Sequence, residues 1–343
     1  MRKVLLLSLL VSASAWTHAQ TDRATTLQAA RSLVVTDNEG QRDYHLVTST
    51  KSFVIRREDG NLVLPGKQQR LADVKSLRLE VPQKFMLSED STTFTAYDVD
   101  HGLLALRRSL QLNKWNSLVV PVEVTGQQVK DAFGEGAQLA ACRDIIETEA
   151  EAQVNFQTID LNTDNVVLQP NQHYILLPTR EPDIAEGKTS TVNYGSAKVA
   201  GPAYLIADAT MTAEDKAAQF KAIRSEQDQV RLRFYGTYKL RDGSQKLINV
   251  YRVNDEGSIT MQTDSVVAKA FTSWIVQARN TNQVPIRFYV DGISINDDAT
   301  RIAEKSPTSN LKPQTIYDLQ GRRVAKVRKQ GLYIVNGKKV IIR

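Results

Sequence analysis

Short runs of alternating apolar and polar residues recur along most of this chain. In the clearest run, Val230–Tyr238, residues at even positions are apolar or small, and arginine, tyrosine and threonine occupy the odd positions. Successive side chains of a strand point to opposite faces, so this period of two predicts a half-buried antiparallel strand. Comparable runs are Ser52–Arg56, Asn61–Leu64, Ser76–Val81, Thr92–Tyr97, Ser117–Val122, Asn165–Leu168, His173–Leu177, Ala203–Ile206, Lys246–Val253, Ser258–Gln262, Thr272–Ala278 and Val284–Val290. Many short strands predict a mostly β fold with an antiparallel β-sandwich or jelly-roll-like body.

Two segments carry helix signals. Thr125–Phe133 has Gln128 three residues after Thr125, the pattern of a capping box, and a glycine follows its last residue. Thr212–Asp228 has acidic residues in its first turn and a narrow apolar stripe, which predicts a surface helix. Thr21–Arg31 is either a further short helix or a disordered lead-in. We therefore expect one or two short helices within the β body.

The first 19 residues have the pattern of a secretory signal peptide. Arg2 and Lys3 precede the apolar run Val4–Val11, and cleavage after Ala15 or Ala19 fits the small residues that follow. This run is too short to span a membrane, which requires about 20 apolar residues. The sequence therefore predicts a secreted chain without a membrane span.

Cys142 is the only cysteine, so no disulfide can form within the chain. The residues before it, Leu139 to Ala141, are apolar. This context favours a small buried side chain over a nucleophile.

The formal net charge of +6 is concentrated at the two ends of the chain. Residues 1–19 contribute +2, and residues 312–343, with nine bases and one acid, contribute +8. Residues 20–311 therefore have a net charge of −4. An acidic body with a basic tail argues against a general nucleic-acid binder, whose basic charge would spread over one face of the fold.

The stretch Asn296–Pro313 is polar and contains two prolines, which predicts a linker between the body and the C-terminal residues. Beyond it, Asn336-Gly337 between two apolar runs is a strong hairpin signal. The predicted organisation is a signal peptide at 1–19, a lead-in at 20–32, N-terminal β strands at 33–112, the main β-sandwich at 113–295, a linker at 296–314 and a small C-terminal β unit at 315–343.

The C-terminal residues resemble a known export signal. Ile316–Val324 (IYDLQGRRV), Gly331–Val335 (GLYIV) and Lys338–Arg343 (KKVIIR) are similar to the C-terminal sorting domain of type IX secretion cargo in Bacteroidetes. The resemblance implies the type IX secretion machinery as a partner and an outer-membrane surface or extracellular location. The residues that match the motif are Tyr317, Asp318, Gly321, Arg322, Gly331, Tyr333, Gly337, Lys338 and Lys339.

The body resembles a β module of Bacteroidales surface proteins. The similarity begins with KWNSLVVPVEV at Lys114–Val124, followed by QVKDAFGEGAQLA at Gln128–Ala140. It implies a surface role without an activity that can be transferred, and it indicates that the matching residues are structural. Further matching segments are Leu33–Val81, Gln169–Pro178, Phe234–Tyr238 and Ile286–Val290.

Candidate sites are sparse. No zinc-hydrolase or nucleophile-elbow motif occurs, and the acid pairs Asp98/Asp100 and Asp297/Asp298 lack the spacing of a calcium loop. The closest approach to such a loop, at Asp98–Gly102, reads instead as a solvated turn. We therefore expect no catalytic residue, no metal and no cofactor. The candidate ligand-binding residues are the aromatic side chains Trp115, Trp274 and Tyr174, although both tryptophans lie in strands that favour core packing.

These observations predict a non-enzymatic, secreted cell-surface protein with an adhesin or structural role. One alternative is a glycan-binding module, which requires an exposed aromatic strip on a sheet face. A second is a hydrolase without a recognisable motif, which requires a cleft with paired carboxylates or a nucleophile beside a histidine. A host protein or glycan is the expected kind of ligand, and nucleic acid is not expected.

Overall fold

A computed structural model describes residues 23–47, 56–58, 60–64, 67–212 and 221–296, and the backbone of four strands nearer the C-terminus. The chain divides into two compact units, Met1–Ile295 and Asn296–Arg343. The prediction of a mostly β chain is confirmed, and the described helices are α1 (Arg23–Gln28) and α2 (Gly126–Phe133), with short 3-10 turns at Leu71–Asp73 and Gly243–Gln245.

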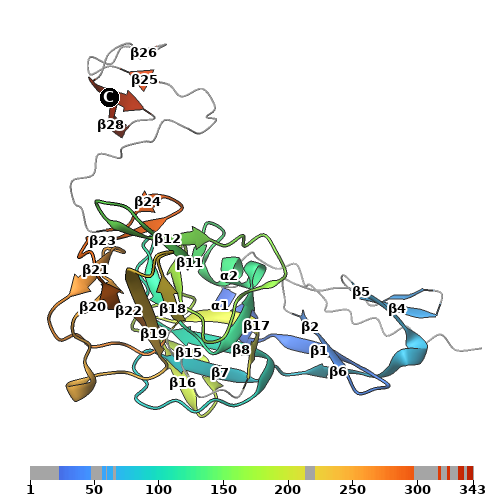
Figure 1. Ribbon diagram of the computed structural model, residues 1–343. Coiled ribbons are helices and arrows are strands. Elements are labelled where there is room, and N and C mark those ends of the chain that lie inside the picture. Colours follow the sequence, from blue (N-terminus) through green and yellow to red (C-terminus); the bar gives the residue numbers. More distant parts are fainter. Residues whose placement is uncertain are drawn as a thin grey trace, which may run out of the picture. The chain divides into compact units, whose positions relative to one another are not determined.

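Three sheets form most of the first unit (Figure 1). The first body sheet contains, in spatial order, β13 (Val166–Leu168), β10 (Val122–Thr125), β17 (Tyr204–Met211), β8 (Val99–Arg107) and β7 (Lys84–Ser88). The central sheet contains β24 (Ile293–Ser294), β23 (Ile286–Val290), β12 (Ala152–Thr158), β11 (Gln138–Glu147), β14 (Tyr174–Leu177) and β9 (Asn116–Leu118). The third sheet contains β18 (Lys221–Arg224), β19 (Val230–Thr237), β22 (Thr272–Asn280), β20 (Val250–Val253) and β21 (Ile259–Gln262).

The central sheet is covered by hydrophobic cores on both faces. Leu139 and Leu176 join a core that includes side chains of the first body sheet and α2. Ala140 and Cys142 join a second core with side chains of the third sheet, such as Leu232. Adjacent strand residues point to opposite faces, so a single strand, β11, contributes to both cores. The interpretation of Cys142 as a small buried side chain is confirmed.

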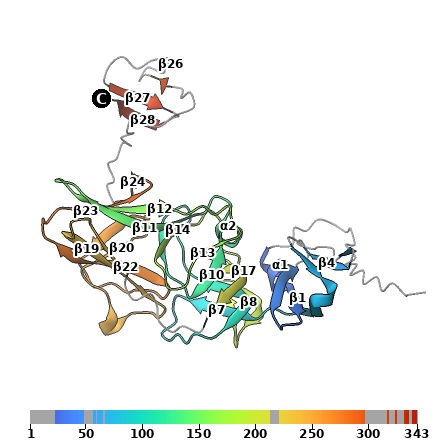
Figure 2. The ribbon, with the colours of Figure 1, turned by 45° about the vertical axis from the view of Figure 1, so that its right-hand side comes forward.

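Smaller sheets flank this body, and Figure 2 shows the N-terminal strands to one side of it. One small sheet has the order β2 (Arg42–Val47), β1 (Arg31–Asp37), β6 (Val74–Glu80), and another has β3 (Arg56–Glu58), β4 (Asn61–Leu64), β5 (Lys67–Arg70). The hairpin of β15 (Thr189–Tyr194) and β16 (Ala197–Ala200) covers the outer side of the first body sheet together with α1, through a core that includes Leu27, Leu103 and Val199.

The predicted helix after Thr125 is confirmed. The Thr125 hydroxyl accepts a hydrogen bond from the Gln128 backbone N–H, and the Gln128 side chain accepts one from the Thr125 N–H. Val129, Ala132 and Phe133 of α2 are buried. This reciprocal capping satisfies two backbone donors that the first turn would otherwise leave open.

The prediction of a helix over Thr212–Asp228 is wrong in its described part. Lys221–Arg224 forms β18, and Ile223 pairs with Leu232 of β19 and is buried in the second core. Pairing with a neighbouring strand buries Ile223 more completely than the narrow stripe of a surface helix would. Here the pairing of β18 with β19 outweighs the local preference of the sequence for a helix.

The predicted strand at Thr92–Tyr97 is absent, for a topological reason. β7 and β8 run parallel, with Phe85 beside Leu104. A parallel pair needs a connection that carries the chain back to its starting edge, and the residues between Ser88 and Val99 serve as that connection. β12 and β23 also pair in parallel, so the body mixes antiparallel and parallel pairs. Most of the predicted run Ser52–Arg56 lies outside the described residues.

The described residues of the second unit form an antiparallel sheet with the order β26 (Arg323–Val324), β25 (Ile316–Tyr317), β27 (Gly331–Val335) and β28 (Lys338–Ile342). Ile316 pairs with both Val324 and Val335, so β25 lies between the other two strands. β27 and β28 form the hairpin that the Asn336-Gly337 signal predicts.

Candidate functional site

A cleft of about 400 Å³ opens in the body where the ends of β7 and β8 meet β9, β20 and β22. Glu89 follows β7, Arg108 follows β8, and Lys269 precedes β22, so three separate stretches of chain bring these charged side chains to one wall of the cleft. Arg252 and Trp274 of the third sheet also line it.

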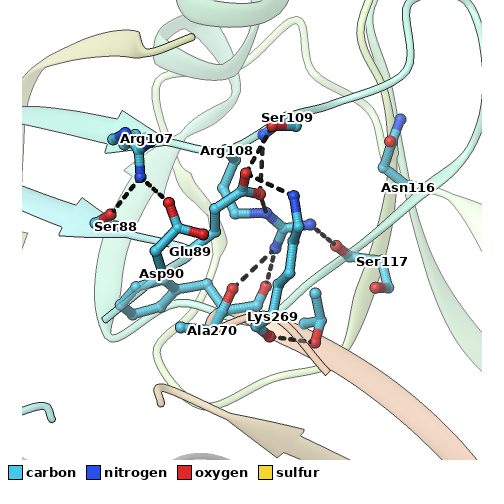
Figure 3. Close-up of polar contacts among 12 residues, drawn as sticks. Ser88, Glu89, Asp90, Arg107, Arg108, Ser109, Asn116, Ser117, Lys269 and Ala270 are labelled. Carbon is cyan, nitrogen blue, oxygen red and sulfur yellow. Dashed lines mark hydrogen bonds and ion pairs between the residues drawn. The ribbon is translucent and has the colours of Figure 1, made fainter. Parts of the chain in front are cut away.

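Glu89 lies at the centre of this cluster and is 4% exposed. Figure 3 shows its carboxylate facing Ser109, Arg108 and Lys269. The Ser109 hydroxyl and backbone N–H donate to it at 2.6 and 3.0 Å, and Lys269 Nζ donates at 2.8 Å. Arg108 Nε lies 3.5 Å from Glu89 Oε2. Burial raises the pKa of Glu89, but Lys269, Ser109 and Arg108 together outweigh burial, so the pKa lies below its ordinary value.

Arg108 is buried beside Glu89 and holds the surrounding loops together. Its guanidinium donates to the backbone carbonyls of Ala270 and Phe271 and, at 3.4 Å, to that of Ser117 (Figure 3). Burial lowers the pKa of Arg108 to about 10, with Glu89 acting in the opposite direction, so the side chain stays charged at neutral pH. The Glu89–Arg108 pair therefore fastens the first body sheet to β9 and to the loop that precedes β22.

The KWNS segment of the surface-protein resemblance supplies structural contacts at the edge of this cleft. Trp115 is buried in the second core. The Asn116 amide donates to the carbonyls of Lys114 and Gln111 at 2.7 and 3.0 Å, and its oxygen accepts from the Gln111 N–H at 2.8 Å. These bonds fix the turn that leads into β9.

The three candidate stacking residues lie in hydrophobic cores. Trp115 is 9% exposed, and Trp274 and Tyr174 are each 5% exposed. The Trp274 ring also stacks beside Tyr235 and lies under Arg241. The glycan-binding alternative requires these aromatic side chains to form an exposed strip, and none of the three is exposed in this way. Trp274 does border the cleft.

Asp100 and His101 lie at the start of β8 instead of in a solvated turn. The Tyr44 hydroxyl donates to Asp100 at 2.8 Å, His101 Nδ1 lies 2.8 Å from Asp208 Oδ1, and the Tyr44 ring stacks on His101. The hydrogen bond with Asp208 raises the pKa of His101, although burial acts against it. The pairing of β8 with β17 extends back to Val99 through irregular register, and this pairing makes the segment a strand.

Among the described residues, no group of three or more His, Cys, Asp or Glu side chains is placed to hold a metal ion. The same part of the chain contains no helix with the length and hydrophobicity needed to cross a membrane. Of the motif residues in the tail, Tyr317 lies in β25, Gly331 and Tyr333 in β27, and Lys338 and Lys339 in β28. Asp318, Gly321, Arg322 and Gly337, and the acid pair Asp297/Asp298, lie outside the described residues.

Sequence reasoning did not identify the Glu89–Arg108–Lys269 cluster. The sequence offers only one hint of this cluster, which is that Glu89 and Arg108 each directly follow a strand. Charged residues are common at strand ends, so this position alone does not indicate a site. Lys269 is 180 positions from Glu89, and only the fold brings the two together. No family model, curated protein or solved structure matches this chain.

Proposed function

We propose that this chain is a non-enzymatic, exported cell-surface protein with an adhesin or structural role, and that its C-terminal unit is the export signal. The observation that carries the proposal is the separate four-stranded sheet of the second unit. Tyr317 pairs with Ile334, so the opening part of the sorting-like motif and its Gly-x-Tyr strand lie side by side in one fold. A compact unit of this kind can be recognised by export machinery independently of the body.

The chemistry of the cleft supports binding or structure over hydrolysis. A glycosidase requires one carboxyl group that gives up a proton near neutral pH, hence one whose pKa is raised. Glu89 has the opposite character, because hydrogen bonds from Lys269 and Ser109 and the charge of Arg108 keep it ionised. Its oxygens are engaged by the protein itself, which suits a structural clamp.

Deletion of residues 315–343 tests the export signal. We expect the shortened chain to accumulate in the periplasm of a Bacteroidetes host that has a type IX system, while the full chain reaches the surface. Surface protease accessibility and cell fractionation measure the distribution. As the reciprocal test, residues 296–343 fused to a periplasmic carrier protein should bring the carrier to the surface. Unchanged surface display of the shortened chain, or a carrier that stays in the periplasm, would refute the proposal.

A further inference from the structure

The outer face of the third sheet carries a row of three arginines on adjacent strands. Arg224 of β18 lies directly opposite Arg231 of β19, and Arg231 lies opposite Arg279 of β22. Figure 1 shows these strands side by side. Ile223 and Leu232, which alternate with the arginines, are buried in the second core, so the arginines face away from it. Because neighbouring strands lie about 5 Å apart, the row sets three cationic side chains next to one another.

A fourth arginine completes this surface, and we call Arg224, Arg231, Arg233 and Arg279 the arginine face. Arg233 is two positions after Arg231, so it projects from the same side of β19, and Ala222 lies opposite it. A shallow hollow of about 370 Å³ is lined by Ala222, Arg224, Arg231 and Arg233. Among the described residues, three arginines and the small side chain of Ala222 border this hollow.

Asp228 offsets part of this charge. It accepts hydrogen bonds from Arg231 at 2.5 and 3.1 Å and from Arg279 at 3.1 Å. The bonds from Arg231, together with the charges of Arg279 and Arg224, lower the pKa of Asp228, so its carboxylate stays ionised. Arg224, Arg231 and Arg279 share this one carboxylate, so these four side chains together have a net charge of +2. Arg233 has a contact of its own. Like charges directly opposite each other on paired strands destabilise a sheet. Proteins keep such locally unfavourable arrangements mainly at functional sites.

We propose that the arginine face binds an acidic polysaccharide through its sulfate or carboxylate groups. A guanidinium group presents parallel N–H donors that bind an anionic group through two oxygens at once. The hollow receives one such group among Arg224, Arg231 and Arg233, and Arg279 extends the row toward the next. The residues of this face are distinct from those that line the cleft around Glu89.

The aromatic surface beside the arginines favours a polysaccharide over a nucleic acid. Proteins that bind single-stranded nucleic acid stack bases on open aromatic rings. Tyr235 projects from β19 on the same side as Arg233, but its ring lies at 13° to the ring of Trp274, with centroids 6.1 Å apart. Arg241 in turn lies 5.4 Å from the Trp274 ring. The choice of a polysaccharide also rests on the proposed function, because an exported chain meets acidic polysaccharides outside the cell.

Binding of the full chain to heparin, with neutral dextran and single-stranded oligothymidine as comparison probes, tests this inference. Arg224→Gln/Arg233→Gln should weaken heparin binding by about tenfold or more, and should lower the salt dependence of binding by about two charges. Lys75→Gln/Arg78→Gln removes the same charge from β6 and should change the affinity less than about twofold. Asp228→Asn, which keeps a residue that tolerates the positive φ at this position, should tighten binding.

The gain expected for Asp228→Asn cannot arise from misfolding, so it complements the loss expected for the double variant. Equal losses in the double variant and the β6 control would overturn the inference, as would heparin binding that disappears when residues 315–343 are deleted. Oligothymidine bound as tightly as heparin through the same arginines would show a nucleic-acid interface instead. The double variant should still reach the cell surface. If the unmodified chain binds heparin as expected but does not reach the surface, the proposed function fails and this inference stands.

Discussion

The cleft cluster and the arginine face both gather cations, but they differ in what surrounds the charge. Arg108 is 5% exposed, pairs with Glu89 and donates to three backbone carbonyls. On the arginine face, Arg231 and Arg279 share the single carboxylate of Asp228, and their side chains are 35% and 49% exposed. A buried cation is stable where the protein supplies its acceptors, whereas an exposed cation relies on water or on a ligand.

This difference separates charge that holds the fold together from charge that is available to a partner. The Glu89–Arg108 pair connects segments from three sheets, so its loss should affect folding. The arginines of the third sheet contact solvent on one side, so their loss should affect binding more than stability. Comparing substitutions in the two regions tests this distinction.

The largest expected effect is the loss of stability in Glu89→Gln. A glutamine at this position directs an amide NH₂ group toward donors of Arg108, Lys269 or Ser109 and leaves the buried Arg108 without its counter-ion. We expect the free energy of unfolding to fall by about 3–5 kcal/mol, measured by urea denaturation. Asp255→Asn is the matched control, because Asp255 lines the same cleft but is exposed. A loss below about 1 kcal/mol in Glu89→Gln would mean that the cluster does not fasten the body.

The contribution of Glu89 should also make the stability of the protein depend on pH, with a smaller change in the free energy of unfolding than the substitution causes. The folded pKa of Glu89 lies below the unfolded value of about 4.3, so its stabilisation is complete above that value and is lost as the pH falls through the folded pKa. The stability difference between the wild type and Glu89→Gln should therefore be constant near neutral pH and shrink below about pH 4. His173 also destabilises the fold in acid, because burial lowers its pKa to about 4. Its contribution is common to both proteins and cancels, and a difference that stays constant down to pH 3 would contradict the assignment.

Features that depend on neighbouring residues could be predicted from the sequence. Thr125 and Gln128 are three positions apart and form the capping box as expected. The alternation within Val230–Thr237 correctly separated the buried Leu232 from the outward-facing Arg231. Both patterns act over one turn or one strand, where local geometry decides the outcome.

Features that depend on distant residues could not be predicted. The helix signals at Thr212–Asp228 were outweighed by the pairing of Lys221–Arg224 with β19. The total charge of the body, near −4, concealed the arginine face, because only the strand register places Arg224 and Arg279 on either side of Arg231. A net charge describes a whole segment, whereas recognition depends on how charges are grouped on one surface.

The smallest expected effect is on the stability of the third sheet. The change in the free energy of unfolding should have opposite signs at Arg224 and Arg231, which lie opposite each other on paired strands. Arg224→Gln removes a like charge directly opposite Arg231, so the free energy of unfolding should rise by about 0.2–0.5 kcal/mol. Arg231→Gln removes the main partner of Asp228, so the free energy of unfolding should fall. Urea denaturation at low and high salt measures both, and salt should reduce both differences because the charges are exposed. A loss above about 1 kcal/mol in Arg224→Gln would show that this side chain supports the fold, as Arg108 does, and would remove the distinction between the two regions.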